Sequence, residues 1–208
     1  MREILPTGIG VLDRMLDGGL PEGSMIAFSA SPTSQSELIL YELTDARPTL
    51  YITTRRSPEA IYDAFERTDT NVGQPNIQGI PGDAPLDHIK DMIRTLPEGS
   101  NLIIDPIDPI EQVGPQRYTA FLNGLQTQMI NTGSIAFLHC IEGRSIPKER
   151  DITEYVADVI FALETTVTGD RVENRLAVPK FRGGRAMDEP IKLELRDSVS
   201  IDTSRDIA

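Results

Sequence analysis

The sequence alternates short apolar runs with stretches of helical periodicity, and this alternation constrains the fold more than any other feature. Apolar residues return every three or four positions in the stretches between the runs. Helices are expected over 36–43 and 116–130, and strands over four runs, namely 25–28, 50–52, 102–105 and 135–138. Strands that alternate with helices form a parallel sheet with both faces covered. The sequence therefore predicts an α/β fold.

A further helix is expected after the second of these runs. Ser57 is placed to cap it and Pro58 suits its first position. Ile61, Tyr62 and Phe65 are then expected to face the core.

The last third of the chain changes character. Residues 159–168 and 171–180 both predict strands, and Thr168-Gly169-Asp170 between them predicts a hairpin turn. Shorter strands are expected over 191–195 and 199–201, while 197–208 is polar and predicts a loose tail. No linker rich in Pro, Gly or Ser separates the two parts. We expect one domain over 1–208 that ends in antiparallel strands.

The excess of acidic residues argues against some classes of binding partner. The 208 residues include 32 acidic and 20 basic side chains, which gives a net charge of −12. Such a surface argues against binding through nucleic-acid phosphates or anionic lipid. Of the basic residues 16 are Arg and only 4 are Lys, which resembles proteins of salt-loving archaea. The alternative is an acidic protein that is merely soluble.

Other features of composition exclude further classes. No apolar run reaches the roughly 18 residues that cross a bilayer, and the first residues lack the apolar core of a signal peptide. The single cysteine, Cys140, excludes a disulfide framework and a Cys-rich zinc module. We therefore expect a cytoplasmic protein without membrane insertion.

A loop between the first strand and the following helix stands where a P-loop would cradle phosphate. A working P-loop reads G-x-x-x-x-G-K-[ST], with glycines that let backbone N–H groups converge and a lysine that neutralises phosphate. The same register gives Ser29 and Ser34 at the glycines and Gln35 at the lysine, so that only Ser36 fits.

The flanking motifs give this loop a context. Thr7-Gly8 and Asp13 precede Gly-Gly-Leu-Pro-Glu-Gly-Ser over 18–24, which leads into the first strand. The chain continues with LYITTRRSPE over 50–59, LIID over 102–105, ADVIFALE over 157–164 and KFRG over 180–183. This ordered set resembles the RecA-like ATPase domain of the KaiC and RadA type over nearly the whole chain. The resemblance implies a mainly parallel sheet flanked by helices.

The resemblance also implies a role for particular positions. Ser36 and Asp105 match the residues that hold magnesium with ATP. Arg55 and Arg56 stand where the family has paired glutamates, one of which polarises water. Lys180 and Arg182 match basic residues that reach a neighbouring subunit's nucleotide.

Each of these residues also has a simpler interpretation. Arg55 and Arg56 are either a substitute anion site or solvated charges at a strand end. Asp105 is alternatively a cap for the turn before Pro106, Ser36 a helix N-cap, and Lys180 with Arg182 a basic turn. Asp108, which also precedes a proline, is expected to be a turn residue.

The two remaining features carry little chemistry by sequence alone. His139 and Cys140 end an apolar strand, where adjacent side chains point to opposite faces and cannot converge as a nucleophile pair. We expect both to be core-packing residues. Residues 142–150 predict a charged loop, a weak candidate for nucleic-acid contact.

The departures from the family pattern favour a non-catalytic function. With Gln35 at the lysine and Arg55 and Arg56 at the glutamates, we expect a pseudo-ATPase that regulates or signals through protein partners. The partner expected is another protein, with an active KaiC-like paralogue as one candidate, and homo-oligomers are an open alternative. No cofactor is expected; a divergent ATPase that binds ATP with magnesium is one alternative, and a RadA-like accessory factor for DNA processing is another.

Overall fold

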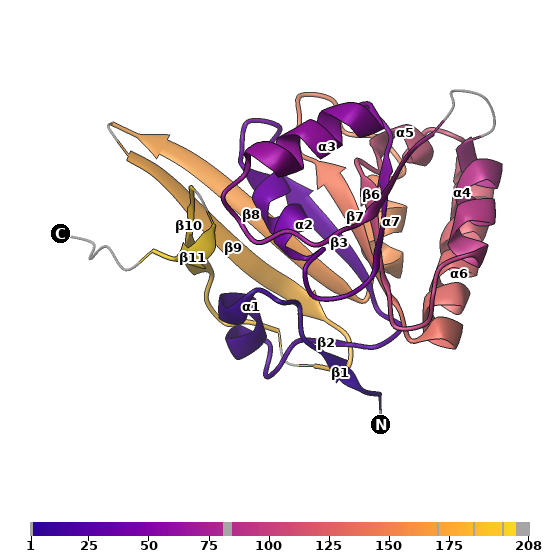
Figure 1. Ribbon diagram of the computed structural model, residues 1–208, viewed down its shortest axis with the longest axis horizontal. Helices are drawn as coiled ribbons and strands as arrows, with labels where there is room; N and C mark the ends of the chain where they lie inside the picture. Colours follow the sequence, from indigo (N-terminus) through magenta and orange to yellow (C-terminus); the bar gives the residue numbers. More distant parts are fainter. Residues whose placement is uncertain (1, 81–84, 170, 185, 197, 203–208) are drawn as a thin grey trace.

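The computed structural model describes residues 2–80, 85–169, 171–184, 186–196 and 198–202. Its helices and strands follow one another along the chain as Figure 1 shows. The helices are α1 (Gly10–Met15), α2 (Ser36–Glu42), α3 (Pro58–Arg67), α4 (Pro85–Arg94), α5 (Asp108–Glu111), α6 (Pro115–Thr132) and α7 (Arg150–Val156). The strands are β1 (Ile4–Leu5), β2 (Leu20–Pro21), β3 (Met25–Ala30), β4 (Thr49–Thr53), β5 (Asn76–Gly79), β6 (Asn101–Asp105), β7 (Ile135–Ile141), β8 (Val159–Thr168), β9 (Arg171–Phe181), β10 (Ile191–Leu195) and β11 (Val199–Ile201).

Nine of the described strands form one mixed sheet in the order β11-β10-β9-β8-β3-β7-β6-β4-β5. The six strands from β8 to β5 run parallel, and β9, β10 and β11 add antiparallel pairs at one side. The four predicted parallel strands are all present as β3, β4, β6 and β7. The predicted α/β fold, a mainly parallel sheet with antiparallel strands in the C-terminal third, is confirmed.

Helices cover both faces of the sheet and enclose two hydrophobic cores. One core packs α1, α2 and α3 against residues such as Phe28, Tyr51 and Phe137. The other packs α4, α5 and α6 against residues such as Ala27, Ile104 and Leu138. Neighbours along one strand thus serve opposite cores, as the pleat of a strand requires.

Local sequence signals account for the ends of two helices. The Ser57 hydroxyl accepts a hydrogen bond from the Ala60 N–H at 3.2 Å, and α3 begins at Pro58, as predicted. Helix α6 begins at a proline and ends before Gly133, whose φ of 61° suits a left-handed cap. The expectation that Tyr62 faces the core is wrong, because its side chain is 47% exposed. Ile61 and Phe65 lie four residues apart on the buried side of α3, and Tyr62 is turned about 100° away from Ile61.

The motif over 18–24 shapes the entry to the sheet. A side chain on Gly19 would come within 2.1 Å of the Leu5 carbonyl oxygen, so the close approach of these two segments requires glycine. Beside it, Asp13 accepts hydrogen bonds from the Thr7 N–H at 2.6 Å and the Thr7 hydroxyl at 2.7 Å. These contacts hold the N-terminal segment against the first core.

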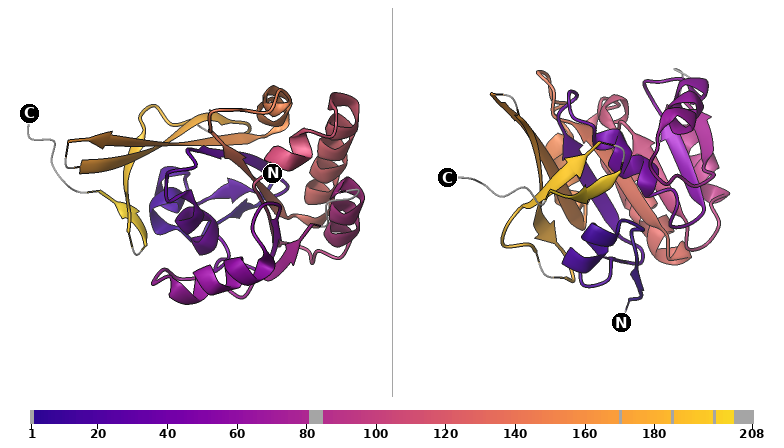
Figure 2. Two further views of the ribbon diagram at one scale, coloured as in Figure 1. Left: turned by 90° about the horizontal axis from the view of Figure 1, so that it is seen from above. Right: turned by 60° about the vertical axis from the view of Figure 1, so that its left-hand side comes forward.

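The antiparallel strands β8 and β9 form a long hairpin that extends away from the parallel part of the sheet (Figure 2). The expected hairpin is confirmed by pairs from Val159 with Phe181 to Thr168 with Arg171, although Asp170 lies outside the described residues. Within 197–208, residues 199–201 form β11, while 197 and 203–208 also lie outside them. Among the described residues, no helix is both long and apolar enough to cross a membrane.

Candidate functional site

The loop between β3 and α2 carries the positions that match a P-loop. Ser29 lies within β3, and its hydroxyl donates to the Phe161 carbonyl oxygen at 3.4 Å. The Ser31 carbonyl oxygen accepts from the Ser34 N–H at 3.0 Å and from the Ser34 hydroxyl at 2.6 Å. Among the described residues only Asp17 combines a side chain with a positive φ, so neither Ser29 nor Ser34 has left-handed backbone. The loop is therefore a tight turn, which the hydrogen bonds from Ser34 to the Ser31 carbonyl oxygen close.

Ser36 is the first residue of α2 and points into the molecule. Gln35 takes the N-cap position and makes no capping hydrogen bond with its side chain. The Ser36 side chain is buried, and its hydroxyl lies 3.2 Å from Nε2 of His139. The N-cap interpretation of Ser36 is therefore wrong, because its oxygen is engaged by a histidine from β7.

Four side chains form a continuous hydrogen-bonded chain at the carboxyl ends of the parallel strands. Nδ1 of His139 lies 2.6 Å from one carboxylate oxygen of Asp105, and the Tyr51 hydroxyl donates to the other at 2.5 Å. With Ser36 the order is Tyr51, Asp105, His139, Ser36, and we call these residues the His139 chain. All four side chains are buried, and the His139 ring stacks on Phe28 with centroids 5.4 Å apart.

The surroundings of Asp105 keep its carboxylate ionised and keep the proton on the Tyr51 hydroxyl. Burial would raise the pKa of the Asp105 carboxyl, but hydrogen bonds from His139 and Tyr51 and the charge of Arg56 hold it below its ordinary 3.8. Burial and the neighbouring Asp105 raise the pKa of the Tyr51 hydroxyl. Asp105 is thus an acceptor only, so Nδ1 of His139 donates the proton of that hydrogen bond, and Nε2 lies within hydrogen-bond distance of the Ser36 hydroxyl.

The expectation for His139 is wrong in part. His139 is buried, as a core residue would be, but both ring nitrogens bond to polar partners. The second part of that expectation holds: Cys140 belongs to the core on the opposite face. Asp105 caps no turn with its carboxylate, which instead binds His139 and Tyr51. One sequence signal could have found His139: it is a polar residue at the carboxyl end of an apolar strand, where α/β proteins bind their ligands.

Arg55 and Arg56 take different positions after β4. Arg55 is exposed on the surface. Arg56 folds back over α2 and α3: Nη1 donates to the Tyr41 hydroxyl at 3.0 Å and Nη2 to the Ala60 carbonyl oxygen at 2.9 Å. The structure therefore separates the two arginines and brings only Arg56 toward the His139 chain.

Lys180 and Arg182 lie together at the end of β9, against the end of α7. The Lys180 ammonium donates to the carbonyl oxygens of Glu154 at 2.6 Å and Tyr155 at 2.9 Å. Arg182 donates to those of Tyr155 at 2.6 Å and Val156 at 3.2 Å. Both cations also lie over the Tyr155 ring: the Lys180 ammonium is 6.0 Å and the Arg182 guanidinium 5.9 Å from the ring centroid. Within the chain they neutralise the C-terminal end of a helix.

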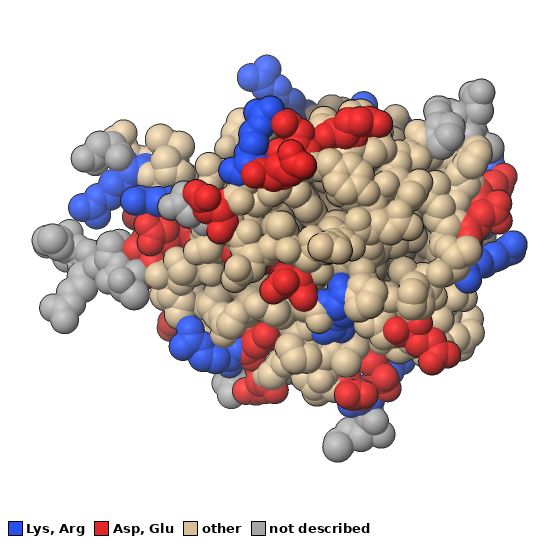
Figure 3. Space-filling view, viewed as in Figure 1, with Lys and Arg blue, Asp and Glu red and all other residues tan. Residues whose placement is uncertain are grey.

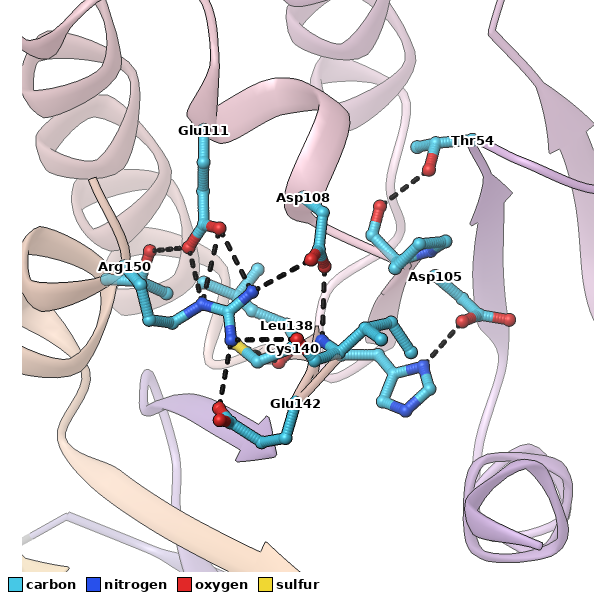
Figure 4. Close-up of polar contacts among 12 residues, drawn as sticks. Thr54, Asp105, Asp108, Glu111, Leu138, Cys140, Glu142 and Arg150 are labelled. Carbon is cyan, nitrogen blue, oxygen red and sulfur yellow. Dashed lines mark hydrogen bonds and ion pairs between the residues drawn. The ribbon is translucent and has the colours of Figure 1, made fainter. Parts of the chain in front are cut away.

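A second buried polar cluster lies behind β7. Arg150 bonds to Glu111 at 2.9 Å, to Asp108 at 3.1 Å and to Glu142 at 3.1 Å, and the Thr153 hydroxyl also donates to Glu111 (Figure 4). We call these five residues the Arg150 cluster. Burial of the guanidinium would lower its pKa, but the hydrogen bonds and charges of these acids raise it.

The Arg150 cluster corrects two sequence expectations. Asp108 is a buried residue of α5 that also accepts from the Ile141 N–H at 3.1 Å, so it is not a simple turn residue. Arg150, assigned to the charged loop over 142–150, is buried at the start of α7. The sequence offered no signal for these pairings, because their members lie 8 to 42 positions apart.

Two hollows open on either side of the start of α2, and Gln35 lines both. The larger has a volume of about 850 Å³ and lies between the closed loop and β8, β9 and β10. The smaller encloses about 330 Å³ between α2 and α3. Within the described part of the chain, no three His, Cys, Asp or Glu side chains gather to hold a metal ion. His139 lies between Ser36 and Asp105, the two residues expected to share magnesium.

The fold is similar to the RecA-like α/β fold of KaiC-like proteins. The crystal structure of the KaiC-like protein PH0186 from the hyperthermophilic archaeon Pyrococcus horikoshii OT3 superposes with a TM-score of 0.74, at 15% identity, over 97% of this chain and 100% of that one. A comparison with curated proteins gives no match. The chain belongs to the family of unknown function DUF7125, whose model matches residues 4–208.

Proposed function

We propose that this chain is a pseudo-ATPase: a non-catalytic KaiC-like domain that regulates or signals through protein partners. The observation that carries the proposal is the His139 ring, which joins Ser36 and Asp105 by hydrogen bonds at 3.2 and 2.6 Å. In the resembled family these two positions serve a magnesium ion. Here the imidazole of His139 bonds to both side chains in place of an ion.

The residues present do not fit ATP with magnesium. A phosphate nest needs converging backbone N–H groups, whereas the Ser34 N–H is bonded within the loop to Ser31. The lysine position holds neutral Gln35, so no charge there offsets the phosphates. Arg56, at a glutamate position, donates to neutral oxygens and cannot act as a base toward water.

These features together argue against turnover. One positioned acid, base or electrostatic group is commonly worth roughly 10²-fold or more in rate. A chain without the lysine, the glutamate and an open metal position lacks three such contributions. Hydrolysis by this chain is therefore expected to be slower than in an active relative by several orders of magnitude.

The acidic surface supports protein partners rather than nucleic acid. The net charge is −12, and the face in Figure 3 carries acidic side chains interspersed with basic ones. DNA phosphates would be repelled by such a surface. Lys180, Arg182 and exposed Tyr155 form a contrasting basic and aromatic patch at the end of α7, which is suited to an acidic protein surface.

The decisive experiment measures nucleotide binding and hydrolysis by the purified protein. A ligand at 100 times its Kd adds about 2.7 kcal/mol, which corresponds to a rise of about 5–10 °C in Tm for a chain of this size. We expect no such rise with MgATP in concentrated KCl. A clear rise, with hydrolysis that Asp105→Asn abolishes, would establish the divergent ATPase instead. Hydrolysis that persists in Asp105→Asn belongs to a contaminant.

A second measurement addresses regulation. Adding the chain to an active KaiC-like ATPase from the same cell should change the ATPase rate of that enzyme or its assembly. The double variant Lys180→Ala/Arg182→Ala should weaken this effect if the patch at the end of α7 makes the contact. An Arg94→Gln variant serves as control, because Arg94 is an exposed cation on a different helix.

A further inference from the structure

The smaller hollow, between α2 and α3, is unusually rich in arginine for so acidic a chain. Its walls include Arg56, Arg67 and Arg196 together with the Tyr41 ring and the carboxylates of Glu37 and Asp63. The walls carry three positive and two negative charges, and Glu194, which pairs with Arg196, brings the local balance to zero, whereas the whole chain carries −12. We call this hollow the arginine groove.

Arg56 differs from the other two arginines in how its charge is balanced. Arg67 is paired with Asp63 at 2.6 Å, and Arg196 with Glu194 at 3.0 Å. Arg56 donates instead to two neutral oxygens, the Tyr41 hydroxyl and the Ala60 carbonyl. Within the described residues it makes no ion pair with a carboxylate, so its charge stays available to a ligand.

The hydrogen bonds of Arg56 also hold its guanidinium in place. Nη1 is held by Tyr41, whose ring packs on Phe65 with centroids 4.4 Å apart, and Nη2 is held by the backbone of α3. A fixed planar guanidinium loses little conformational freedom when it binds an oxyanion, and its geometry matches phosphate or carboxylate. Arg56 is exposed, as Arg55 is, but its hydrogen bonds make it a preorganised anion donor.

We propose that the arginine groove binds the phosphate group of a small organic phosphate, with Arg56 as the main ligand. Arg67 and Arg196 add charge at the rim, and the Tyr41 hydroxyl and Gln35 amide supply neutral polar contacts. Glu37 and Asp63 can accept hydrogen bonds from ligand hydroxyl groups. A volume of about 330 Å³ is at the small end of ligand sites and suits a small organic phosphate.

This site overlaps only in part with the one that the resemblance implies for ATP. Gln35 and Arg56, at the lysine and glutamate positions, line the arginine groove, whereas Ser36 and Asp105, at the magnesium positions, do not. Binding there needs no magnesium, so the proposal goes beyond the pseudo-ATPase assignment and survives or fails separately from it. Occupancy would place an anion beside Arg56, whose charge acts on Asp105 in the His139 chain.

Isothermal titration calorimetry tests the proposal, with EDTA present and no nucleotide. The titrants are ribose 5-phosphate, inorganic phosphate and ribose, in a chloride buffer of moderate ionic strength. We expect ribose 5-phosphate to bind more tightly than inorganic phosphate, and ribose not to bind. Equal affinities for the two phosphates would overturn the organic ligand in favour of free phosphate. Failure of both phosphates to bind would overturn the site.

Matched variants assign the binding to Arg56. Loss of a charged hydrogen-bond donor should weaken ribose 5-phosphate binding by about 10-fold or more in Arg56→Gln. Arg55→Gln removes the same charge from the neighbouring residue, which does not line the groove, and should change the Kd by less than about 2-fold. Equal weakening in both variants would show a diffuse charge effect and contradict the proposal.

An optical signal provides a second measurement. The chain has five tyrosines and no tryptophan, so tyrosine emission is not masked. A phosphate that pulls on Arg56 alters the hydrogen bond to Tyr41, and emission should change with the Kd found by calorimetry. Tyr41→Phe should lose this change and bind the ligand more weakly, because it removes a polar contact and releases Nη1 of Arg56. A change in emission and a Kd that both persist unaltered in Tyr41→Phe would place the ligand elsewhere.

Discussion

The two buried polar clusters lie back to back on opposite faces of β7, yet they are built on different principles. His139 stacks on Phe28 in the core of α1, α2 and α3 and enters a chain with one carboxylate, that of Asp105. On the other face, the Arg150 cluster surrounds a permanent cation with three carboxylates. One cluster joins mostly neutral partners by hydrogen bonds, whereas the other is a network of ion pairs.

This difference predicts how strongly each cluster stabilises the fold. Removing one partner from a buried ion pair leaves an uncompensated charge, whereas removing a neutral partner leaves only an unmade hydrogen bond. The Arg150 cluster should therefore be the less tolerant of substitution. It links α5, β7 and α7 and so positions the end of the sheet where the His139 chain lies.

The largest effect is expected from Arg150→Met. The substitution keeps most of the side-chain volume but leaves Glu111, which is completely buried, without its cation. We expect a loss of about 3–5 kcal/mol in the free energy of unfolding, measured by urea denaturation. The double variant Arg150→Met/Glu111→Gln should be less destabilised than Arg150→Met alone. A loss below about 1 kcal/mol for Arg150→Met would contradict the ion-pair account.

His139→Phe should have a smaller effect. Phenylalanine preserves the stacking on Phe28 but cannot bond to Ser36 or Asp105. Asp105 keeps its bond from Tyr51, so we expect a loss of about 2 kcal/mol. If urea denaturation gives a loss as large as that of Arg150→Met, the supposed contrast between the two clusters is wrong.

The sequence predicts the framework of the molecule far better than the partners of its polar groups. Apolar runs and helical periodicity located β3, β4, β6 and β7, because burial alone determines them. Short elements such as β5 and α5 were not predicted, because they owe their form to tertiary packing. The matched positions Ser36 and Asp105 are joined only through His139, and this histidine was not foreseen. Its partner atoms depend on register between β3, β6 and β7, which no local pattern encodes.

Acid should weaken the contribution of Asp105 in the His139 chain. The pKa of Asp105 is lower in the folded chain than its ordinary 3.8, so ionised Asp105 stabilises the fold above that pH, and this contribution is lost as pH falls through the folded pKa. The difference in unfolding free energy between the native protein and Asp105→Asn should therefore shrink as pH drops below about 4. A gap that is constant from pH 6 to pH 3 would exclude a depressed pKa. Asp63→Asn, in an exposed pair with Arg67, should cost under about 1 kcal/mol at pH 6.

The smallest expected difference is between two buried tyrosines, one from each face of the sheet. Both Tyr51 and Tyr118 are completely buried and donate or share one hydroxyl hydrogen bond, but Tyr51 bonds to the Asp105 carboxylate at 2.5 Å and Tyr118 to the Thr153 hydroxyl at 2.7 Å. Replacement by phenylalanine removes one oxygen in each case, so the packing loss is nearly the same. Hydrogen bonds to charged groups contribute about 1.5–3 kcal/mol and neutral ones about 0.5–1.5 kcal/mol. Tyr51→Phe should therefore be about 1 kcal/mol more destabilising than Tyr118→Phe in urea denaturation near pH 7. At a pH low enough to protonate Asp105 the two losses should converge, and losses that are equal already at pH 7 would show that the Asp105 charge does not reach Tyr51.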